Sequence, residues 1–207
     1  MGIPELVIAH GVSFGRTAFG LVTKPYETYR RIIEKGKLGE LLFIAFLLAL
    51  YFSLASLVKV SAFRPFLLTR QFIVLAFGAG SGALLSILLL SVFGKLLGAA
   101  VRVSSLVVAW GYTLIPTVLW FLMTSFLYVI LPPPRTTSVA GVTFSLLFII
   151  VSATLLWWKI TLAYLTLRFG LRFDMGKSIL FIGLSAPFLI LWSVMMYTLG
   201  IFKVPFI

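Results

Sequence analysis

Very few side chains in this chain could carry out chemistry. The 207 residues include five acidic residues, one histidine (His10) and no cysteine. The lack of cysteine excludes thiolate nucleophiles and Cys-ligated metals, and a single histidine excludes a His-based metal cluster and leaves no Ser-His-Asp triad. The sequence therefore predicts a protein that is not an enzyme and that binds no cofactor or metal. None of the acidic residues falls in the middle of a long apolar stretch; they are Glu5, Glu27, Glu34, Glu40 and Asp174.

Lys159 is the one formal charge that lies more than a few residues inside a long apolar stretch. It lies six residues before the expected end of that stretch at Leu165, which is ~9 Å along a helix. Because a charge inside a membrane is costly, such a residue points to a function by default. A lysine stem can also extend to the headgroups, and Trp157 and Trp158 beside it are typical of a membrane interface. Two interpretations stay open: a lysine that snorkels, or an intramembrane charge with a buried partner or lipid headgroup.

A pair of glycines in the second apolar stretch could form a helix-packing face. Gly78 and Gly82 form a small-xxx-small pair, which lets helix backbones approach closely. We expect this face to pack inside the bundle, with dimerisation as the alternative.

Pro116 and Pro187 each remove a backbone N–H from an apolar stretch, so both helices are expected to kink. The freed carbonyls are either satisfied by nearby hydroxyls or available to a polar ligand.

Composition places these residues in a membrane. The chain is 61% apolar, against about 45–50% in a typical soluble domain, and its mean hydropathy is +1.17. In so apolar a chain, the net charge of +12 belongs at membrane edges, and we expect no nucleic-acid partner. Asparagine is absent and Gln71 is the single glutamine, which fits either a thermophilic source or membrane composition alone.

Five continuous apolar stretches are long enough to cross a bilayer. The first, 38–58, covers ~31 Å as a helix, against a hydrocarbon core of ~30 Å. Continuous rather than alternating apolar residues indicate helices and not barrel strands. The sequence therefore predicts an all-α, polytopic membrane protein with five transmembrane helices. The stretches are 38–58, 71–93, 104–131, 142–165 and 178–202.

The chain is expected to consist of two parts: a cytosolic N-terminal segment, 1–37, and a five-helix transmembrane domain, 38–207. Glycines at positions 11, 15 and 20 weaken any helix in the first 22 residues, so this part is expected to be a tail that lies on the bilayer.

A short amphipathic helix is expected to follow from Pro25, which suits a first helical turn. Glu27 with Arg31 and Arg30 with Glu34 are opposite charges four residues apart. Apolar residues on one side and basic residues on the other are typical of an interfacial helix. Its basic side is expected to bind anionic lipid headgroups through Lys24, Arg30, Arg31, Lys35 and Lys37.

The distribution of lysine and arginine predicts the orientation of the chain. Eleven basic residues fall on one side of the expected spans and five on the other. Because basic residues concentrate in cytoplasmic connections, we expect a multi-pass protein of the cell membrane with a cytosolic N terminus and an extracytoplasmic C terminus. The cytosolic residues are Arg16, Lys24, Arg30, Arg31, Lys35, Lys37, Lys95, Arg102, Arg168, Arg172 and Lys177. The residues on the other side are Lys59, Arg64, Arg70, Arg135 and Lys203.

Three short segments together resemble the Yip1 domain family of five-span membrane proteins. The residues Gly111-Tyr112-Thr113-Leu114-Ile115-Pro116 are similar to the Gly-Tyr-x-Leu-x-Pro signature of its third span. Lys24-Pro25-Tyr26-Glu27-Thr28-Tyr29-Arg30 is similar to the segment that precedes its membrane domain. Trp157-Trp158, Leu162 and Arg168-Phe169-Gly170-Leu171 match the region around the end of the fourth span. The resemblance covers roughly 21–202.

The resemblance implies five spans, a cytosolic N terminus and a membrane-organising or adaptor role. For Gly111, Tyr112, Leu114 and Pro116 it implies a fold-defining role. Eukaryotic members bind prenylated Rab GTPases, but their Asp-Leu-x-Gly-Pro element is missing here, with Thr23-Lys24-Pro25 near its place. The chain therefore resembles a prokaryotic-type member, and GTPase binding is not implied.

The expected function is that of a non-enzymatic scaffold or adaptor in the membrane. Its expected partners are anionic membrane lipids and either a second copy of the chain or another membrane protein. The alternative is a small transporter or channel subunit with a site near the kinked third and fifth helices.

Overall fold

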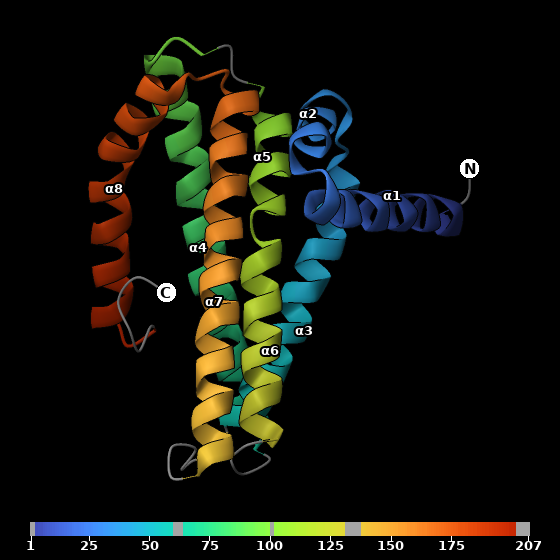
Figure 1. The fold of residues 1–207 in the computed structure, drawn as a ribbon, viewed down its shortest axis with the longest axis vertical. Coiled ribbons are helices and arrows are strands. Elements are labelled where there is room, and N and C mark those ends of the chain that lie inside the picture. The colour runs from blue at the N-terminus through green and yellow to red at the C-terminus, as the bar shows by residue number, and fades with distance from the viewer. Residues whose placement is uncertain (1–2, 60–63, 100–101, 131–137, 202–207) are drawn as a thin grey trace.

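The computed structural model describes residues 3–59, 64–99, 102–130 and 138–201, and within these ranges all regular elements are helices (Figure 1). Five helical segments are long and apolar enough to span a membrane, which confirms the predicted five-span fold. They are Leu38–Leu57, Pro65–Leu96, Val103–Leu127, Gly141–Gly170 and Met175–Thr198.

The spans are built from helices whose ends follow local sequence signals. Pro65 stands in the first turn of α4, Ser138 caps α7 by accepting a bond from the Gly141 N–H over 3.1 Å, and Asp174 caps α8 through the Lys177 N–H over 2.8 Å. The membrane-spanning elements are η1 (Leu38–Glu40), α3 (Leu41–Lys59), α4 (Pro65–Leu96), α5 (Val103–Tyr112), α6 (Ile115–Ile130), α7 (Val139–Leu165), the π-helical η2 (Thr166–Gly170) and α8 (Met175–Thr198).

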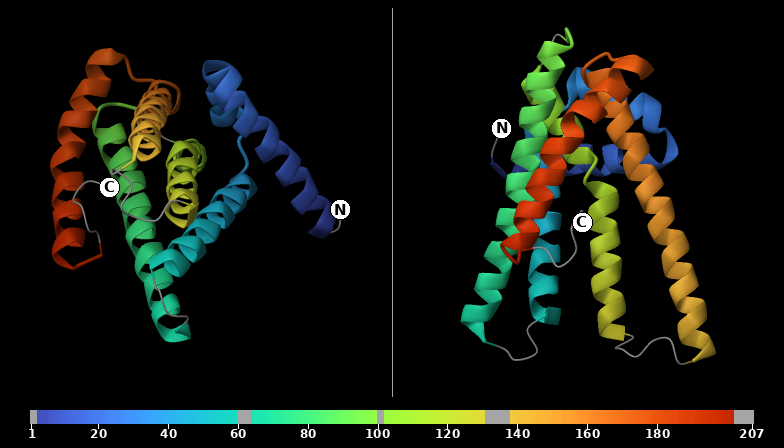
Figure 2. Two further views of the ribbon diagram at one scale, coloured as in Figure 1. Left: turned by 60° about the horizontal axis from the view of Figure 1, so that its bottom comes forward. Right: turned by 90° about the vertical axis from the view of Figure 1, so that its left-hand side faces the viewer.

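The spans run roughly along the long axis of the molecule (Figures 1 and 2), and neighbouring spans contact one another in the order α7, α6, α3, α4 and α8. Half of the most apolar stretch of Val103–Leu127 is buried, against 6% of the corresponding stretch of Gly141–Gly170. The third span is therefore the most buried of the five, and most of the α7 surface is left for lipid.

The N-terminal residues differ from the prediction in one respect: they form a continuous helix, α1 (Ile3–Thr23), although their glycines were expected to weaken any helix there. It runs crosswise to the spans, beside the end of the bundle at which α2 also lies (Figure 1). Its glycines serve as contact points: a Cβ on Gly11 would meet the Phe43 ring at 3.2 Å, and one on Gly20 would meet Thr28 Oγ1 at 2.6 Å. The expectation of a weak helix was wrong because it considered the helix propensity of glycine alone and not the tertiary contacts that small residues permit.

The predicted amphipathic helix is present as α2 (Pro25–Lys35), with Pro25 in its first turn. Its apolar side, including the buried Tyr29 and Ile32, faces α5 rather than lying open. We call this end of the molecule the α1–α2 end.

The two prolines act differently. The third span is interrupted rather than kinked: α5 ends at Tyr112 and α6 begins at Ile115, one residue before Pro116. At the break, the Thr113 and Leu114 N–H groups bond to the carbonyls of Trp110 and Gly111, three residues back. In contrast, α8 continues through Pro187 as one helix.

Candidate functional site

A buried polar cluster lies where α1, the first span and the third span meet. We call it the Glu40 cluster; it consists of Ser13, Glu40 and Tyr112. Ser13 Oγ donates to Glu40 Oε1 over 2.6 Å, and the Tyr112 hydroxyl donates to Glu40 Oε2 over 2.5 Å. Glu40 is only 3% exposed. One carboxylate thus links three segments that are 27 and 72 residues apart in the chain.

The surroundings of Glu40 suit a buried negative charge. Burying a carboxylate is costly unless hydrogen bonds replace its hydration, and each of its oxygens accepts one from a hydroxyl. Glu40 also directly precedes α3, and the positive end of a helix dipole favours an anion there. The Tyr112 ring stacks on Phe14, with ring centroids 6.1 Å apart. These contacts make the cluster a fixed connection between helices.

The sequence did not indicate this role for Glu40, which was expected to be an acid at the edge of a span. Two signals could have found it. A tyrosine in the middle of an apolar span, Tyr112, needs a partner for its hydroxyl. Glu40 stands directly before a continuous apolar run, where an unpaired carboxylate would be unfavourable.

A second buried tyrosine, Tyr29, fixes α2 to the third span. Its side chain is fully buried, and its hydroxyl donates to the Ala109 carbonyl over 3.1 Å. Burial raises the pKa of Tyr29 well above its usual range, and the neighbouring Thr166 hydroxyl opposes the rise. The Tyr29 hydroxyl therefore keeps its proton and remains the donor of this hydrogen bond.

The three segments that resemble the Yip1 family come together at this place. Tyr26 of the pre-membrane segment packs edge-on against Phe169 of η2, with centroids 4.6 Å apart. Leu21, Tyr29, Tyr112 and Leu162 belong to one buried core. Sequence segments far apart in the chain therefore build one joint at the α1–α2 end.

The signature residues of the third span lie in this joint. Gly111 is buried, and a Cβ there would clash with the Leu41 side chain, so the first and third spans approach closely at this point. Leu114 packs at the edge of the same core and Pro116 is buried at the start of α6. Gly111 thus allows the first and third spans to approach closely, Tyr112 bonds to Glu40 in the Glu40 cluster, and Pro116 stands at the break between α5 and α6.

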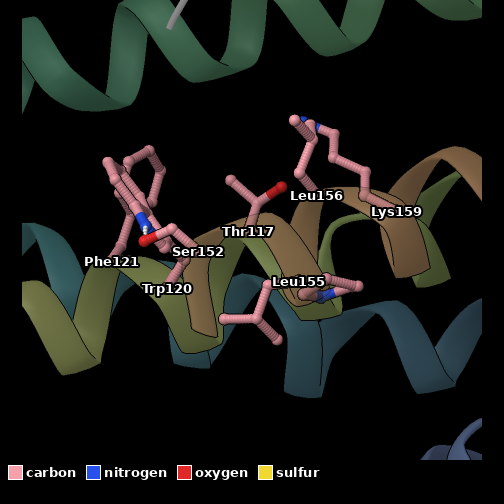
Figure 3. A pocket seen from close by; sticks show the side chains of 8 residues that line it. Thr117, Trp120, Phe121, Ser152, Leu155, Leu156 and Lys159 are labelled. Atoms are coloured by element: carbon pink, nitrogen blue, oxygen red, sulfur yellow. Dashed lines mark hydrogen bonds between the residues drawn. The ribbon is translucent and has the colours of Figure 1, made fainter. Parts of the chain in front are cut away.

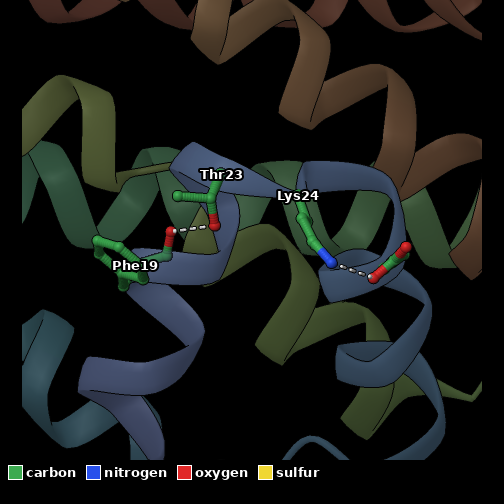
Figure 4. Close-up of polar contacts among 4 residues, drawn as sticks. Phe19, Thr23 and Lys24 are labelled. Atoms are coloured by element: carbon green, nitrogen blue, oxygen red, sulfur yellow. Dashed lines mark hydrogen bonds and ion pairs between the residues drawn. The ribbon is translucent and has the colours of Figure 1, made fainter.

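The basic residues predicted to bind lipid headgroups are exposed at the α1–α2 end. Of the two predicted ion pairs, Arg30 with Glu34 is present at 3.1 Å, whereas Glu27 pairs with Lys24 at 3.9 Å and not with Arg31 (Figure 4). The Lys24 pair forms because α2 begins directly after Lys24, which places it one turn before Glu27. Within the described chain, Arg31, Lys35 and Lys37 are left without an ion pair.

Gly82 lies against α8 in this structure. A Cβ there would come within 2.8 Å of the Trp192 ring, whose Nε1 donates to Ser81 Oγ over 3.3 Å. Gly78 is buried on the same helix. The face that could serve dimerisation therefore contacts α8 of the same chain at Gly82.

Lys159 lies in a pocket of about 370 Å³ between α6 and α7 (Figure 3). The pocket residues come from the third and fourth spans. Lys159 is partly buried, and its side chain extends toward Leu156, one turn earlier in α7. Thr117 and Trp120 of α6 lie opposite.

Among the residues that the structure describes, no three His, Cys, Asp or Glu side chains are grouped so that they could hold a metal ion. No curated protein and no solved structure matches the chain. The profile of the Yip1 domain, however, matches residues 19–197, which is most of the sequence and includes all three segments of the joint. The chain therefore belongs to the Yip1 domain family and is a multi-pass integral membrane protein.

Proposed function

We propose that the protein is a non-enzymatic scaffold or adaptor in the cell membrane whose α1–α2 end faces the cytosol and binds anionic lipid. The observation that carries this proposal is the set of exposed basic residues without ion-pair partners on α2 and just after it, Arg31, Lys35 and Lys37. Each basic residue near an anionic surface contributes about 1 kcal/mol of attraction.

The rest of this end reinforces the attraction. The C-terminal end of α4, the N-terminal end of α5, the helix η2 and the N-terminal end of α8 lie at the same end of the bundle as α2 (Figure 1). These ends and the residues that adjoin them carry Lys95, Arg102, Arg168, Arg172 and Lys177. Two of these residues also make hydrogen bonds within the protein. Arg168 donates to the Phe173 carbonyl over 3.0 Å, and Lys177 donates to the Leu97 carbonyl over 3.3 Å.

A fixed α2 suits a scaffold better than a flexible basic tail would. Tyr29 and Ile32 bury one side of α2 against α5, so its basic residues keep a constant spacing. A partner or a lipid cluster would then meet a preformed surface, which lowers the entropic cost of binding.

The lipid part of the proposal is tested with the full chain in nanodiscs of mixed neutral and anionic lipid. Native mass spectrometry would count the anionic lipids that remain bound. We expect enrichment in the natural protein and a clear loss in the triple variant Arg31→Gln, Lys35→Gln, Lys37→Gln. The matched control is Arg64→Gln with Arg70→Gln at the opposite end. Equal retention in both variants would contradict the proposal.

The adaptor part is tested by crosslinking in native membranes, with purification through a C-terminal tag. A stoichiometric membrane-protein partner, or a second copy of the chain, would support it and name the assembly. Recovery of the monomer with lipid alone would contradict it, whatever the result of the lipid experiment.

A further inference from the structure

We propose that the pocket between α6 and α7 binds a single-chain anionic amphiphile from the membrane, with Lys159 as the counter-ion of its acidic group. The proposal concerns a different part of the molecule from the basic α1–α2 end. It depends on four features of the pocket: its unpaired cation, its unpaired hydroxyl, its apolar walls and its size.

Lys159 is the cation. No carboxylate, hydroxyl or carbonyl of the described chain bonds to its ammonium group, although the side chain is partly buried. Because Cα–Cβ bonds tilt toward the N-terminus of a helix, a lysine near the C-terminal end of α7 leans away from the nearer membrane surface. Figure 3 shows this direction, toward Leu156. Snorkelling to the nearer surface is therefore unfavourable, and an anion inside the pocket would compensate the charge.

Thr117 supplies the hydroxyl. Other threonines in the spans, such as Thr124 and Thr161, donate to the carbonyl four residues before them. For Thr117 that residue is Thr113, which lies in the break between α5 and α6. Its Oγ1 is buried and has no hydrogen-bond partner among the described residues. Buried hydroxyls are nearly always paired, so this one is free to donate to a ligand.

Lys159 and Thr117 can serve the same ligand. Both line the pocket, from α7 and α6 respectively, and their side chains point to the same side, toward α4 (Figure 3). Farther along the pocket, Trp120 Nε1 donates to Ser152 Oγ over 2.8 Å. This bond joins α6 to α7 and leaves the ammonium and Thr117 as the polar groups without a partner.

The walls and the volume indicate an amphiphile with one chain. Phe121, Leu155 and Leu156 provide apolar surface, and Leu156 is 58% exposed on the little-covered side of α7, so entry is from the lipid. The volume of about 370 Å³ is near the lower end of the ~300–1,000 Å³ range of ligand pockets. A carboxylate on one acyl chain fits these limits better than a phospholipid headgroup with two chains.

The test uses the full chain in nanodiscs and a photoreactive long-chain fatty acid, with the labelled peptides identified by mass spectrometry. We expect labelling of the α6 and α7 pocket residues, competition by unlabelled fatty acid and none by the fatty alcohol of equal length. Lys159→Gln should lower the apparent affinity about ten- to hundredfold, as for loss of a charge-assisted bond. Thr117→Val should give a smaller loss in the same direction, and Arg64→Gln, at an exposed position remote from the pocket, should give none.

Three results would overturn the proposal: equal competition by acid and alcohol, unchanged labelling in Lys159→Gln, or labelling spread evenly over the lipid-facing helices. Labelling of the pocket by a photoreactive anionic phospholipid and not by the fatty acid would also overturn the choice of occupant. Thermal unfolding of each variant shows that it is folded, and Thr117→Val supplies the answer should Lys159→Gln fail to fold.

Discussion

Two charged residues at membrane depth or near it have opposite environments. Glu40 is 3% exposed and both its oxygens accept hydrogen bonds, from Ser13 and Tyr112. Lys159 has no partner in the described chain and borders a pocket. A satisfied buried charge stabilises one packing arrangement, whereas an unsatisfied one is available to a ligand. Glu40 is therefore a structural residue, and Lys159 is a binding residue in our proposal.

The structural role of Glu40 predicts the effect of Tyr112→Phe. This change removes one hydroxyl donor and leaves a buried carboxylate oxygen unpaired, which should lower the free energy of unfolding by about 2–3 kcal/mol. Unfolding in mixed micelles, followed by circular dichroism, would measure the loss.

The matched control is Tyr51→Phe, because Tyr51 stacks on Phe121 with centroids 4.4 Å apart and its hydroxyl has no hydrogen bond within the described chain. It should change stability by less than about 0.5 kcal/mol. If both variants lost the same amount, the Tyr112 hydroxyl would have no special role.

Among the helices, α1 depends most on contacts that the sequence does not reveal. The five spans could be predicted because lipid imposes a local rule: a long apolar run must satisfy its own backbone as a helix. In α1, propensity argued against a helix at Gly11 and Gly20, while the contacts that favour it come from Phe43 and Thr28. For the same reason, the sequence could flag Glu40 and Tyr112 as polar groups in need of partners but could not pair them, since they are 72 residues apart.

The corner between α1 and α2 gives a prediction for Gly20→Ala. Its Cβ would meet Thr28 Oγ1 at 2.6 Å, whereas a Cβ on Gly15 would meet nothing within 4 Å. Gly15→Ala should therefore stabilise by about 0.5–1 kcal/mol through helix propensity. Gly20→Ala should be about 1–3 kcal/mol less stable than that control, because of overpacking. Thermal unfolding in detergent would compare the two variants.

The double variant Gly20→Ala, Thr28→Ala checks the cause. The Thr28 Cβ would lie 3.5 Å from the new methyl group, an ordinary contact distance, so removing the hydroxyl and methyl of Thr28 should recover most of the difference. Independent, additive effects of the two changes would show that this close approach does not limit stability.

The pair of α4 and α8 gives a prediction for Gly82→Val. A Cβ at Gly82 would press on the Trp192 ring, whereas Gly80 on the same helix has open space. We expect Gly82→Val to destabilise the monomer by about 1–3 kcal/mol, and Gly80→Val to have a smaller effect. Thermal unfolding and the mass in detergent would be measured together. A change in oligomeric mass without destabilisation of the monomer would instead assign Gly82 to a dimer interface.

At the scale of the whole molecule, positive charge is concentrated at one end. The α1–α2 end carries the two N-terminal helices, the C-terminal ends of α4 and α7 and the N-terminal ends of α5 and α8, whereas α3 and α6 end, and α4 and α7 begin, at the opposite end (Figure 1). Of the basic residues expected at that opposite end, Arg135 and Lys203 lie outside the described residues, and Lys59, Arg64 and Arg70 lie within them. The same joint that fixes α1 and α2 thus also gathers the basic residues.

This asymmetry predicts the orientation of the molecule, with the α1–α2 end in the cytosol. Because the chain has no cysteine, a single introduced cysteine reports its own side without background. Lys35→Cys and Arg64→Cys replace exposed residues at opposite ends. In intact cells, a membrane-impermeant maleimide should label Arg64→Cys and not Lys35→Cys, and permeabilisation should expose both, which controls for reactivity. The reverse pattern would place the basic surface outside the cell, away from the anionic cytosolic leaflet, and the proposed lipid-binding scaffold would then lose its physical basis.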